Sequence, residues 1–469
     1  MKPMKIVIAS DSFKGTLESR RIIEIATKAA KEAIPDAQCV GIPVADGGEG
    51  TVDAVMASVV RQNGEVYSPG AFARGEYVYA KVHDPLGNLV DARYCLITPA
   101  LKPKAGASGV SQQALDAKRG QEPAWHGKTA VIEMAAASGL GLVPENLRNP
   151  LKTSTFGTGE LIKDALDHGA SDIYIGIGGS ATNDGGIGCL AALGAVFKFQ
   201  GTKPGPGFPT GESLIRLCDI DISNLDRRLY STRITVLCDV TNPLCGPEGA
   251  TYTFGPQKIG EIPDFTPAGA PVQIMQNTQI PQIPQSLQIP QNPQNLQNTQ
   301  QPPDQRVSAI LATLESGMQN YKSIILKNYG IDPDWIKGAG AAGGLGAALS
   351  LFLGGKMQSG IETVLDLAGF NEALENADLV ITGEGRLDAQ SLKGKVVSGV
   401  AKIAKKKGVP VAAICGSVDA SDTLISKLGL KNVFTLVDEE TPLNEALAKA
   451  EECYYKTALK LFYRSPYLL

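Results

Sequence analysis

Both ends of the chain carry the same pattern: a short apolar run rich in β-branched residues, then a polar loop, then a helical segment. "KIVIAS" (5–10) leads into a helical pattern over about 17–33, and "CVGIPVADGGEG" (39–50) repeats the arrangement. Near the other end, "ADLVITGEGRLDAQSLKGK" (377–395) does so again and is followed by a further helix and strand. Apolar strands that alternate with amphipathic helices are typical of a parallel sheet covered on both faces. The sequence therefore predicts an α/β protein in which the two chain ends form one Rossmann-like domain.

The middle of the chain predicts a second α/β domain, inserted between the two halves of the first. Its clearest elements are a β-hairpin over 77–97, which alternates around a Pro-Leu-Gly-Asn turn, and a buried strand that runs into residue 176. A length of 469 residues also favours two domains or more. We expect the Rossmann-like domain to comprise 1–62 and 360–469, and the inserted domain to comprise 63–359.

Two stretches of the middle look like additions to this domain. Residues 99–127 are polar and lack a clear period, and a low-complexity segment at about 265–305 is rich in Gln, Pro and Asn. In this second segment Gln recurs at every third position from Gln273 to Gln300. A period of three matches polyproline II, but a tandem duplication in a disordered loop explains it equally well. We expect a tolerated insert, with a docking site for a partner as the alternative.

Charge and composition argue against several classes of function. The formal net charge of −4 and the pI near 5.6 disfavour nucleic acid as a partner, because binding to a phosphate backbone needs a basic face. Three histidines, and eight cysteines without a C-x-x-C pair, disfavour a zinc site. No apolar run reaches the length of a membrane span, and the first residues lack the apolar core of a signal peptide. We therefore expect a cytoplasmic protein with no membrane partner.

Polar residues gather in the loops that directly follow the predicted strands. In open α/β sheets, ligands bind at the carboxyl ends of strands, so these loops are the candidate site. The most unusual is "GIGGSATNDGGIG" (176–188), a glycine run with one acid. The candidate residues of all the loops are Asp11, Lys14, Asp46, Glu49, Gly178, Gly179, Ser180, Asn183, Asp184, Asp239, Asn242, Gly383, Glu384, Arg386, Asp388, Gln390 and Lys395.

This set of residues suits phosphoryl transfer. Glycine-rich loops that open a helix present unpaired N–H groups, which bind phosphate. Carboxylates beside them would repel phosphate unless a cation such as Mg²⁺ lay between, and lysines and an arginine would neutralise further charge. A carboxylate near a substrate hydroxyl can accept its proton. Structural alternatives stand beside these roles: Asp-Gly-Gly at 46–48 and 184–186 is a good turn, and Glu384 and Asp388 could simply pair with Arg386.

Two common nucleotide-binding motifs do not account for such a site. "GAGAAG" (338–343) matches the dinucleotide pattern G-x-G-x-x-G, but the residues before it do not predict a buried strand. The Walker A sequence is absent from the chain, which excludes a P-loop NTPase. Two rival hypotheses remain: a nucleotide-dependent oxidoreductase based on 338–343, and a non-catalytic interaction protein that acts through the Gln-rich segment.

Seven segments together resemble the signature blocks of the bacterial glycerate kinase family, of the type that lacks a P-loop. They are "IASDSFKGTLES", "PVADGGEGT", "TAVIEMAAASGL", "GIGGSATNDGGIG", "CDVTNPLCGPEGA", "GAGAAGGLG" and "TGEGRLDAQSLKGK", in the family's order over nearly the whole chain. The resemblance implies a two-domain α/β enzyme that transfers phosphate from ATP to D-glycerate with Mg²⁺. Members of this type usually give 2-phospho-D-glycerate, with 3-phosphoglycerate as the alternative product.

We assign roles to the site residues as hypotheses under this resemblance. Asp184 is expected to be the general base or a carboxylate that organises the metal, and Lys14 to neutralise phosphate or hold the substrate carboxylate. Substrate contacts are expected from Asp11, Asp46, Glu49, Ser180, Asn183 and Arg386. ATP contacts are expected from Gly178, Gly179, Gly383 and Glu384, and metal contacts from Asp239 and Asp388. If Asp184 is the base, Asp184→Asn should lower turnover about 10²-fold with folding unchanged.

Overall fold

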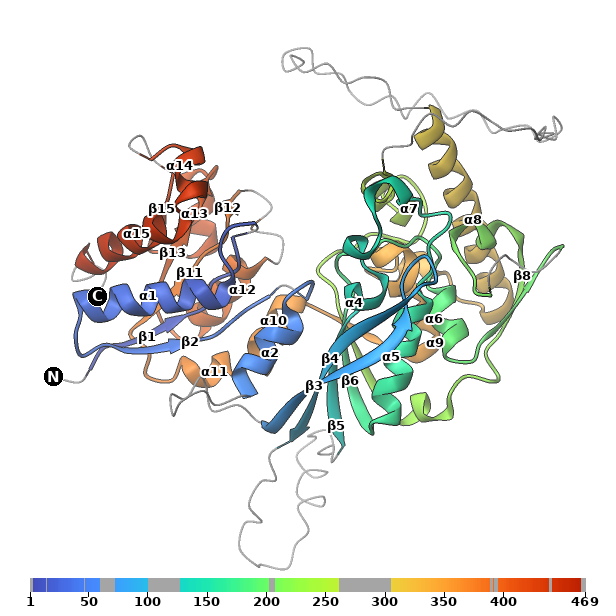
Figure 1. Cartoon of the computed structure of the whole chain (residues 1–469), viewed down its shortest axis with the longest axis horizontal. Helices are drawn as coiled ribbons and strands as arrows, with labels where there is room; N and C mark the ends of the chain where they lie inside the picture. Colours follow the sequence, from blue (N-terminus) through green and yellow to red (C-terminus); the bar gives the residue numbers. More distant parts are fainter. Residues whose placement is uncertain are drawn as a thin grey trace, which may run out of the picture.

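The structure of the protein is a computed structural model that describes residues 3–13, 15–45, 47–59, 72–99, 127–201, 207–260, 305–388, 391, 395–437 and 441–464. Three predicted site residues, Lys14, Asp46 and Gln390, lie outside the described residues, and so do 100–126 and 265–304 of the two predicted additions. The described chain forms two main sheets, each with helices around it (Figure 1).

The first sheet is built from both ends of the chain, which confirms the predicted fold class. Within the described residues it has five strands in the order β15-β13-β11-β1-β2, and each neighbouring pair is parallel. The strands are β1 (Lys5–Ile8), β2 (Gln38–Gly41), β11 (Leu379–Thr382), β13 (Val411–Cys415) and β15 (Asn432–Thr435). A separate small sheet pairs β12 (Arg386–Leu387) with β14 (Ser417–Val418).

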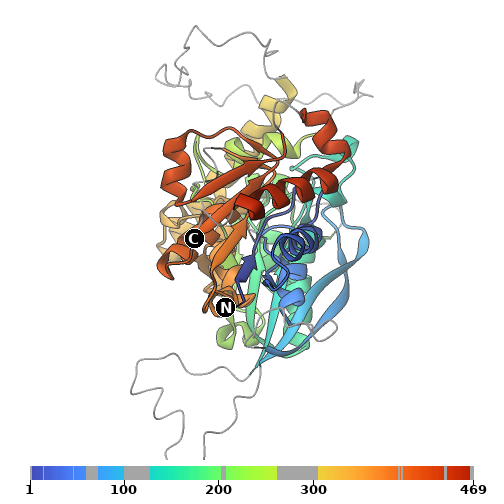
Figure 2. The same ribbon diagram turned by 90° about the vertical axis from the view of Figure 1, so that its left-hand side faces the viewer.

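Helices cover both faces of this sheet, because side chains in each strand alternate between two apolar layers. Ile6 and Ile8 pack in the layer with α1 and α15, which lie side by side in Figure 2 (blue and red). Val7 packs in the opposite layer with α10, α11 and α12. The helices of this part are α1 (Ser19–Ala33), α10 (Gly360–Leu367), α11 (Phe370–Ala373), α12 (Val396–Lys406), α13 (Asp422–Leu428), α14 (Leu443–Ala448) and α15 (Ala450–Arg464).

The second sheet is built from the middle of the chain. Among the described residues it has six strands in the order β10-β9-β6-β5-β4-β3. β3 and β4 form the predicted antiparallel hairpin, whereas β5, β6, β9 and β10 run parallel to one another. The strands are β3 (Phe72–His83), β4 (Leu89–Pro99), β5 (Lys128–Glu133), β6 (Ala170–Gly176), β9 (Arg233–Leu237) and β10 (Lys356–Gln358). Outside this sheet, β7 (Val196–Phe199) pairs with β8 (Leu217–Asp221).

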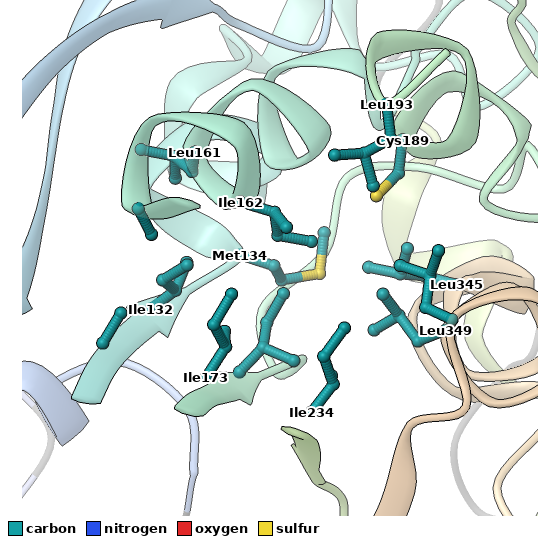
Figure 3. Close-up of a cluster of buried hydrophobic side chains, with 14 of the residues drawn as sticks. Ile132, Met134, Leu161, Ile162, Ile173, Cys189, Leu193, Ile234, Leu345 and Leu349 are labelled. Carbon is teal, nitrogen blue, oxygen red and sulfur yellow. The ribbon is translucent and has the colours of Figure 1, made fainter. Parts of the chain in front are cut away.

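One face of the second sheet carries a large apolar core, shown in part in Figure 3. Ile132, Ile173 and Ile234, from three neighbouring strands, pack with Ile162 of α5 and Leu349 of α9. The α-helices of this part are α4 (Ala135–Ser138), α5 (Phe156–Asp167), α6 (Ile187–Ala192), α7 (Ala250–Phe254), α8 (Gln305–Tyr329) and α9 (Leu345–Leu353). Short 3-10 helices span Leu140–Leu142, Glu145–Leu147, Gly211–Arg216, Arg227–Ser231, Pro256–Lys258, Pro333–Trp335 and Ala341–Gly344. None of the helices in the described part of the chain is both long and apolar enough to cross a membrane.

Helices α2 (Thr51–Val59) and α10 lie between the two sheets (Figure 1). Although α2 follows a strand of the first sheet, its Val52 packs in an apolar cluster with β4 and β5 of the second. Helix α10 packs against both sheets: Ile361 lies in the core of the first, and Val364 packs with Leu237 of the second. The predicted domain boundaries stay a prediction, and α10 packs against apolar residues on both sides.

The segment 338–344 does not have the context of a dinucleotide-binding loop. A 3-10 turn, rather than a strand, precedes it. It enters α9 through three residues with left-handed backbone, Ala342 (φ 52°), Gly343 (φ 66°) and Gly344 (φ 93°). This conformation suits glycine and is rare for alanine. Helix α9 therefore begins only after this segment, at Leu345.

Candidate functional site

The loops at the carboxyl edges of the two sheets touch each other. Gly47 and Gly48 follow β2 of the first sheet, and Gly176 and Gly178 lie at the end of β6 of the second. A Cβ atom on Gly176 would lie 2.2 Å from the Gly47 carbonyl oxygen, and one on Gly178 would lie 3.0 Å from the Gly48 Cα. Because the carboxyl ends of parallel strands share one edge of a sheet, this contact brings the two candidate loop edges together. Glycine at these positions allows the close approach of two backbones.

Gly178 and Gly179 form an exposed corner of this loop. The Gly179 carbonyl accepts a hydrogen bond from the Leu140 amide at 2.8 Å, which fixes the corner to the segment after β5. The amide N–H groups of Gly178 and Gly179 have no acceptor among the described residues. Exposed backbone N–H groups at such a corner can bind an anion. The nucleotide contact predicted for these two glycines stays a prediction that this geometry allows.

Asp184 is 0% exposed, and its carboxylate is surrounded by donors from its own chain. Oδ2 accepts hydrogen bonds from the Thr155 amide and hydroxyl, both at 2.8 Å, and from the Gly188 amide at 3.3 Å. Oδ1 accepts from the Gly186 amide at 3.1 Å. Burial raises the pKa of Asp184, and the hydrogen bonds oppose that rise because they favour the charged form.

This carboxylate joins the first turns of two helices. Thr155 precedes α5, and Gly186 and Gly188 lie at the start of α6, so both helix dipoles favour a negative charge at this point. A general base must come within hydrogen-bond reach of the proton that it accepts, and the described structure buries Asp184 completely. The base role stays a prediction. The geometry favours the structural alternative, in which Asp184 holds the turn.

Lys258 lies buried against the same loop, and sequence reasoning did not single it out. Its Nζ donates to the Ser180 Oγ and to the Thr182 carbonyl, both at 2.7 Å. Burial lowers the pKa of Lys258 to about 7, and the nearby Asp184 charge opposes the shift. Lys258 stands outside every motif and close to the Gln-rich segment, so no sequence signal marks it.

Ser180 and Asn183, both predicted to bind substrate, are placed differently. Ser180 keeps 9% exposure beside the exposed Gly179. Asn183 is fully buried, and its Nδ2 donates to the Thr251 Oγ1 at 3.2 Å. The Asn183 Oδ1 has no hydrogen-bond partner among the described residues. Ser180 is therefore the better placed of the two to contact a ligand in this conformation.

The second half of the loop packs against segment 338–344, backbone to backbone. The Gly185 amide donates to the Gly343 carbonyl at 2.9 Å. A Cβ atom on Gly343 would lie 2.1 Å from the Thr182 carbonyl oxygen. A Cβ atom on Gly186 would lie 2.4 Å from the Ala348 Cβ. Gly343 thus leaves space for the backbone of the loop, and Gly186 leaves space for the start of α9.

Three carboxylates gather at the carboxyl edge of the first sheet. Glu384 is buried after β11 and accepts a hydrogen bond from the Ser391 hydroxyl. Burial raises the pKa of Glu384; the Lys395 charge opposes this rise, whereas the charges of Asp11 and Asp388 add to it. These four charged residues therefore lie within electrostatic reach of one another. Their oxygen atoms are of the type that Mg²⁺ prefers.

Two other predicted residues of this edge have structural contacts. Arg386 is exposed and forms ion pairs with Asp419 at 2.6 Å and with Asp388 at 3.8 Å. A Cβ atom on Gly383 would lie 1.9 Å from the Ile414 carbonyl oxygen, so glycine is needed there for strand packing. The pairing of Arg386 with Asp388 agrees with the structural alternative. The substrate role of Arg386 and the nucleotide role of Gly383 stay predictions.

Carboxylates near the second sheet accept hydrogen bonds at the starts of α10 and α2. The Asp239 Oδ1 accepts from the Gly360 amide at 3.1 Å. Glu133, at the end of β5, accepts from the Val52 amide at 2.7 Å. Burial raises the pKa of Glu133, with a smaller contribution from the exposed Glu49. Glu133 was not predicted, although it lies within one of the seven family-like segments. The metal role of Asp239 and the substrate role of Glu49 stay predictions.

The described residues contain no group of three His, Cys, Asp or Glu side chains arranged to hold a metal ion. Mg²⁺ in kinases uses one or two carboxylates together with substrate phosphates, so the carboxylates after β1 and β11 still fit it. A pocket of about 500 Å³ lies elsewhere, lined by Gln358, Thr363, Asn371 and Lys406 among others. None of the predicted site residues lines this pocket, so the candidate site stays at the loop edges.

Comparison with known proteins gives a consistent result over nearly the whole chain. The model of the "Glycerate kinase family" matches residues 6–264 and 307–464. Glycerate 2-kinase of Escherichia coli K12 is 40% identical over 448 residues, which cover 95% of this chain and 94% of that protein. Glycerate kinase of Bacillus subtilis 168 is 38% identical over 97% of this chain and 96% of its own length.

A solved structure agrees with these sequence matches. A crystal structure from Salmonella typhimurium LT2, described under the name glycerate kinase 2, superposes with a TM-score of 0.69 at 37% identity and covers 100% of both chains. The chain belongs to the glycerate kinase family. The resemblance of the seven segments is thereby confirmed, and the hypothesis of an oxidoreductase based on 338–343 is not supported.

Proposed function

We propose that this chain is an ATP-dependent kinase that phosphorylates the 2-hydroxyl of D-glycerate to give 2-phospho-D-glycerate. Family membership supports the substrate, and the name of the Escherichia coli relative supports the hydroxyl. Phosphorylation of the 3-hydroxyl is the alternative. We also propose a cytoplasmic location, because all eight cysteines are free, as is usual in a reducing compartment.

The observation that supports this proposal most is the contact between the loop edges of the two sheets, one of which offers backbone amides and the other carboxylates. The edge of the second sheet offers the amides of two exposed residues, Gly178 and Gly179, which suit an anionic oxygen. The edge of the first sheet offers the carboxylates of Asp11, Glu384 and Asp388. Strands β2 and β11 are two positions apart in that sheet, or about 10 Å, so both edges lie within the span of a nucleoside triphosphate and a small acid.

Mg²⁺ suits the accessible carboxylates of the first edge, and we propose that Asp388 and Asp11 bind it. When bound, the ion neutralises phosphate oxygens during transfer. The proton of the substrate hydroxyl needs an acceptor at the same place. Asp11 and Glu49 are accessible carboxylates there, whereas Asp184 is buried. We therefore propose that Asp184 shapes the site and that an accessible carboxylate accepts the proton.

³¹P NMR of the products tests the reaction and its regiochemistry together. The purified protein is incubated with ATP, MgCl₂ and D-glycerate, with L-glycerate and a reaction without protein as controls. A 2-phosphoglycerate signal that needs D-glycerate is the expected result. A 3-phosphoglycerate signal would support the kinase activity but show that the 3-hydroxyl, and not the 2-hydroxyl, is phosphorylated. Folded protein that leaves glycerate unphosphorylated would overturn the proposal.

A further inference from the structure

The side chain of Lys258 is buried against the loop that the proposed function uses, yet that function assigns it no role. Lys258 is 1% exposed, and lysine is rarely buried to this degree. Its 3-10 helix, Pro256–Lys258, directly follows α7 and leads the chain toward the Gln-rich segment. A buried ammonium is costly unless it is paired and hydrogen-bonded. Its hydrogen-bond partners, Ser180 and Thr182, both belong to the candidate site loop.

The ammonium controls the direction of the Ser180 hydroxyl. A lysine ammonium has three donors and no acceptor, so the Ser180 oxygen must accept from it. The Ser180 proton is then available for a second acceptor, and Ser180 Oγ donates to no acceptor among the described residues. Ser180 keeps some exposure beside Gly179, whose amide also has no acceptor there. Two neighbouring residues of the loop, the exposed Gly179 and the 9% exposed Ser180, thus each have a donor with no acceptor within the described residues.

We propose that Lys258 is a positioning residue: its ammonium fixes Ser180 as a hydrogen-bond donor to the carboxylate of the small hydroxy-acid substrate. The proposal deepens the proposed function and rests on it. Lys258 acts through Ser180 and does not itself touch the substrate. Its second bond, to the Thr182 carbonyl, fixes the loop backbone between Ser180 and Asp184.

The protonation of Lys258 makes this arrangement sensitive to pH. Burial brings the pKa of Lys258 to about 7, and Asp184 is the charged group in the described structure that acts on it through space. Above this pH the neutral amine gains a lone pair, which can accept the Ser180 proton and turn it inward. The KM for D-glycerate should therefore rise as the pH increases through about 7, while the KM for ATP should not follow it.

Three variants test the proposal: Lys258→Met, Ser180→Ala and the double variant. Methionine has a similar length without charge or donors, so it suits the buried position. Loss of a hydrogen bond to a charged group typically lowers affinity about tenfold to a hundredfold, so each single variant should raise the KM for D-glycerate by about that factor. The double variant should resemble Ser180→Ala, because Lys258 acts through Ser180. The pH dependence of this KM should be absent in Ser180→Ala.

A folded Lys258→Met protein with an unchanged KM for D-glycerate would overturn the proposal, as would fully additive effects in the double variant. If Lys258→Met does not fold, the pH dependence of the KM for D-glycerate in Ser180→Ala is the deciding measurement. A KM that still rises above pH 7 in this variant would exclude the coupling between Lys258 and Ser180. An inactive wild-type protein would instead overturn the proposed function, so the two failures are distinguishable.

A stability measurement checks the buried lysine without using activity. The lowered folded-state pKa means that the unfolded chain binds more protons between about pH 7 and the ordinary lysine pKa of 10.5. The free energy of unfolding should therefore increase as the pH rises through this window. In Lys258→Met this increase should be absent. Equal pH slopes for the two proteins would show that Lys258 is not buried as described.

Discussion

The carboxylate of Asp184 accepts hydrogen bonds from three backbone amides and one hydroxyl, and all four donors are fixed by the starts of two helices. Such a site matches a carboxylate and does not match an amide. An asparagine has the same shape, but its NH₂ group would face one of these N–H donors. The buried donor would then lose its acceptor, which usually costs more than the net value of a hydrogen bond.

We expect Asp184→Asn to lower the free energy of unfolding by about 1–3 kcal/mol, because a buried donor is left unsatisfied. The loss of loop shape should also raise the KM for D-glycerate. Urea unfolding together with steady-state kinetics measures both effects. Asp91→Asn, at an exposed position of β4, is the matched control and should change neither.

The same experiment separates positioning from direct proton transfer. If Asp184 is the general base, turnover should fall about 10²-fold while the unfolding midpoint and the KM for D-glycerate stay unchanged. That outcome would contradict the role argued here. It would also require a conformation in which Asp184 reaches the substrate.

Among the elements, the least expected contact joins the loop after β6 to the segment before α9. Both are glycine-rich: Gly343 and Gly344 leave space for the backbone of residues 182–185, and Gly186 leaves space for the start of α9. The segment before α9 also contains Ala342 in a left-handed conformation, which an L-residue adopts only when its surroundings impose it. Backbone atoms therefore form much of this contact.

Gly343→Ala should be strongly destabilising, by about 2–5 kcal/mol, since left-handed strain and a backbone clash add together. Gly330→Ala is the matched control. Its φ of +70° is close to the +66° of Gly343, but a Cβ atom on Gly330 would meet nothing within 4 Å. The control should therefore cost only about 1 kcal/mol. Equal unfolding midpoints for the two variants in urea would argue against the packing described.

At the scale of the whole molecule, the Gln-rich segment is a part of the sequence that the family does not share. The family model matches the chain up to residue 264 and resumes at 307, so the intervening residues lie outside the matched ranges. A long insertion costs little in loop-closure entropy, which supports the prediction of a tolerated insert. Lys258, only a few residues before it, is by contrast buried in the site.

Replacement of 265–304 by a short Gly/Ser linker should leave kcat and KM unchanged and shift the free energy of unfolding by no more than about 1 kcal/mol. Kinetics and urea unfolding of the shortened protein check this prediction. A version with the same residues in shuffled order is the control for the three-residue period. A folded but inactive shortened protein would mean that the segment contributes to catalysis.

Much of the fold follows from local pattern. Apolar runs such as "KIVIAS" predict buried parallel strands because helices cover both faces of such a sheet, and the alternation over 77–97 predicts the hairpin that β3 and β4 form. The loops that follow these strands could be named in advance for the same reason. Family membership was also readable, because seven segments occur in the family's order.

Contacts between segments that are distant in the sequence determine the burial and the hydrogen-bond partners of the site residues. The sequence alone predicts Asp184 as an acid in a glycine loop, but its burial depends on Thr155 and on the packing of two helices. Lys258 carries no local signal, since a lysine becomes buried only when other elements close over it. Helix α10 likewise packs against both sheets, and α2 against the second, through apolar faces whose partners are remote in the chain. Local sequence determined strands, turns and candidate loops because these depend on neighbouring residues, whereas burial and hydrogen-bond partners depend on the three-dimensional packing.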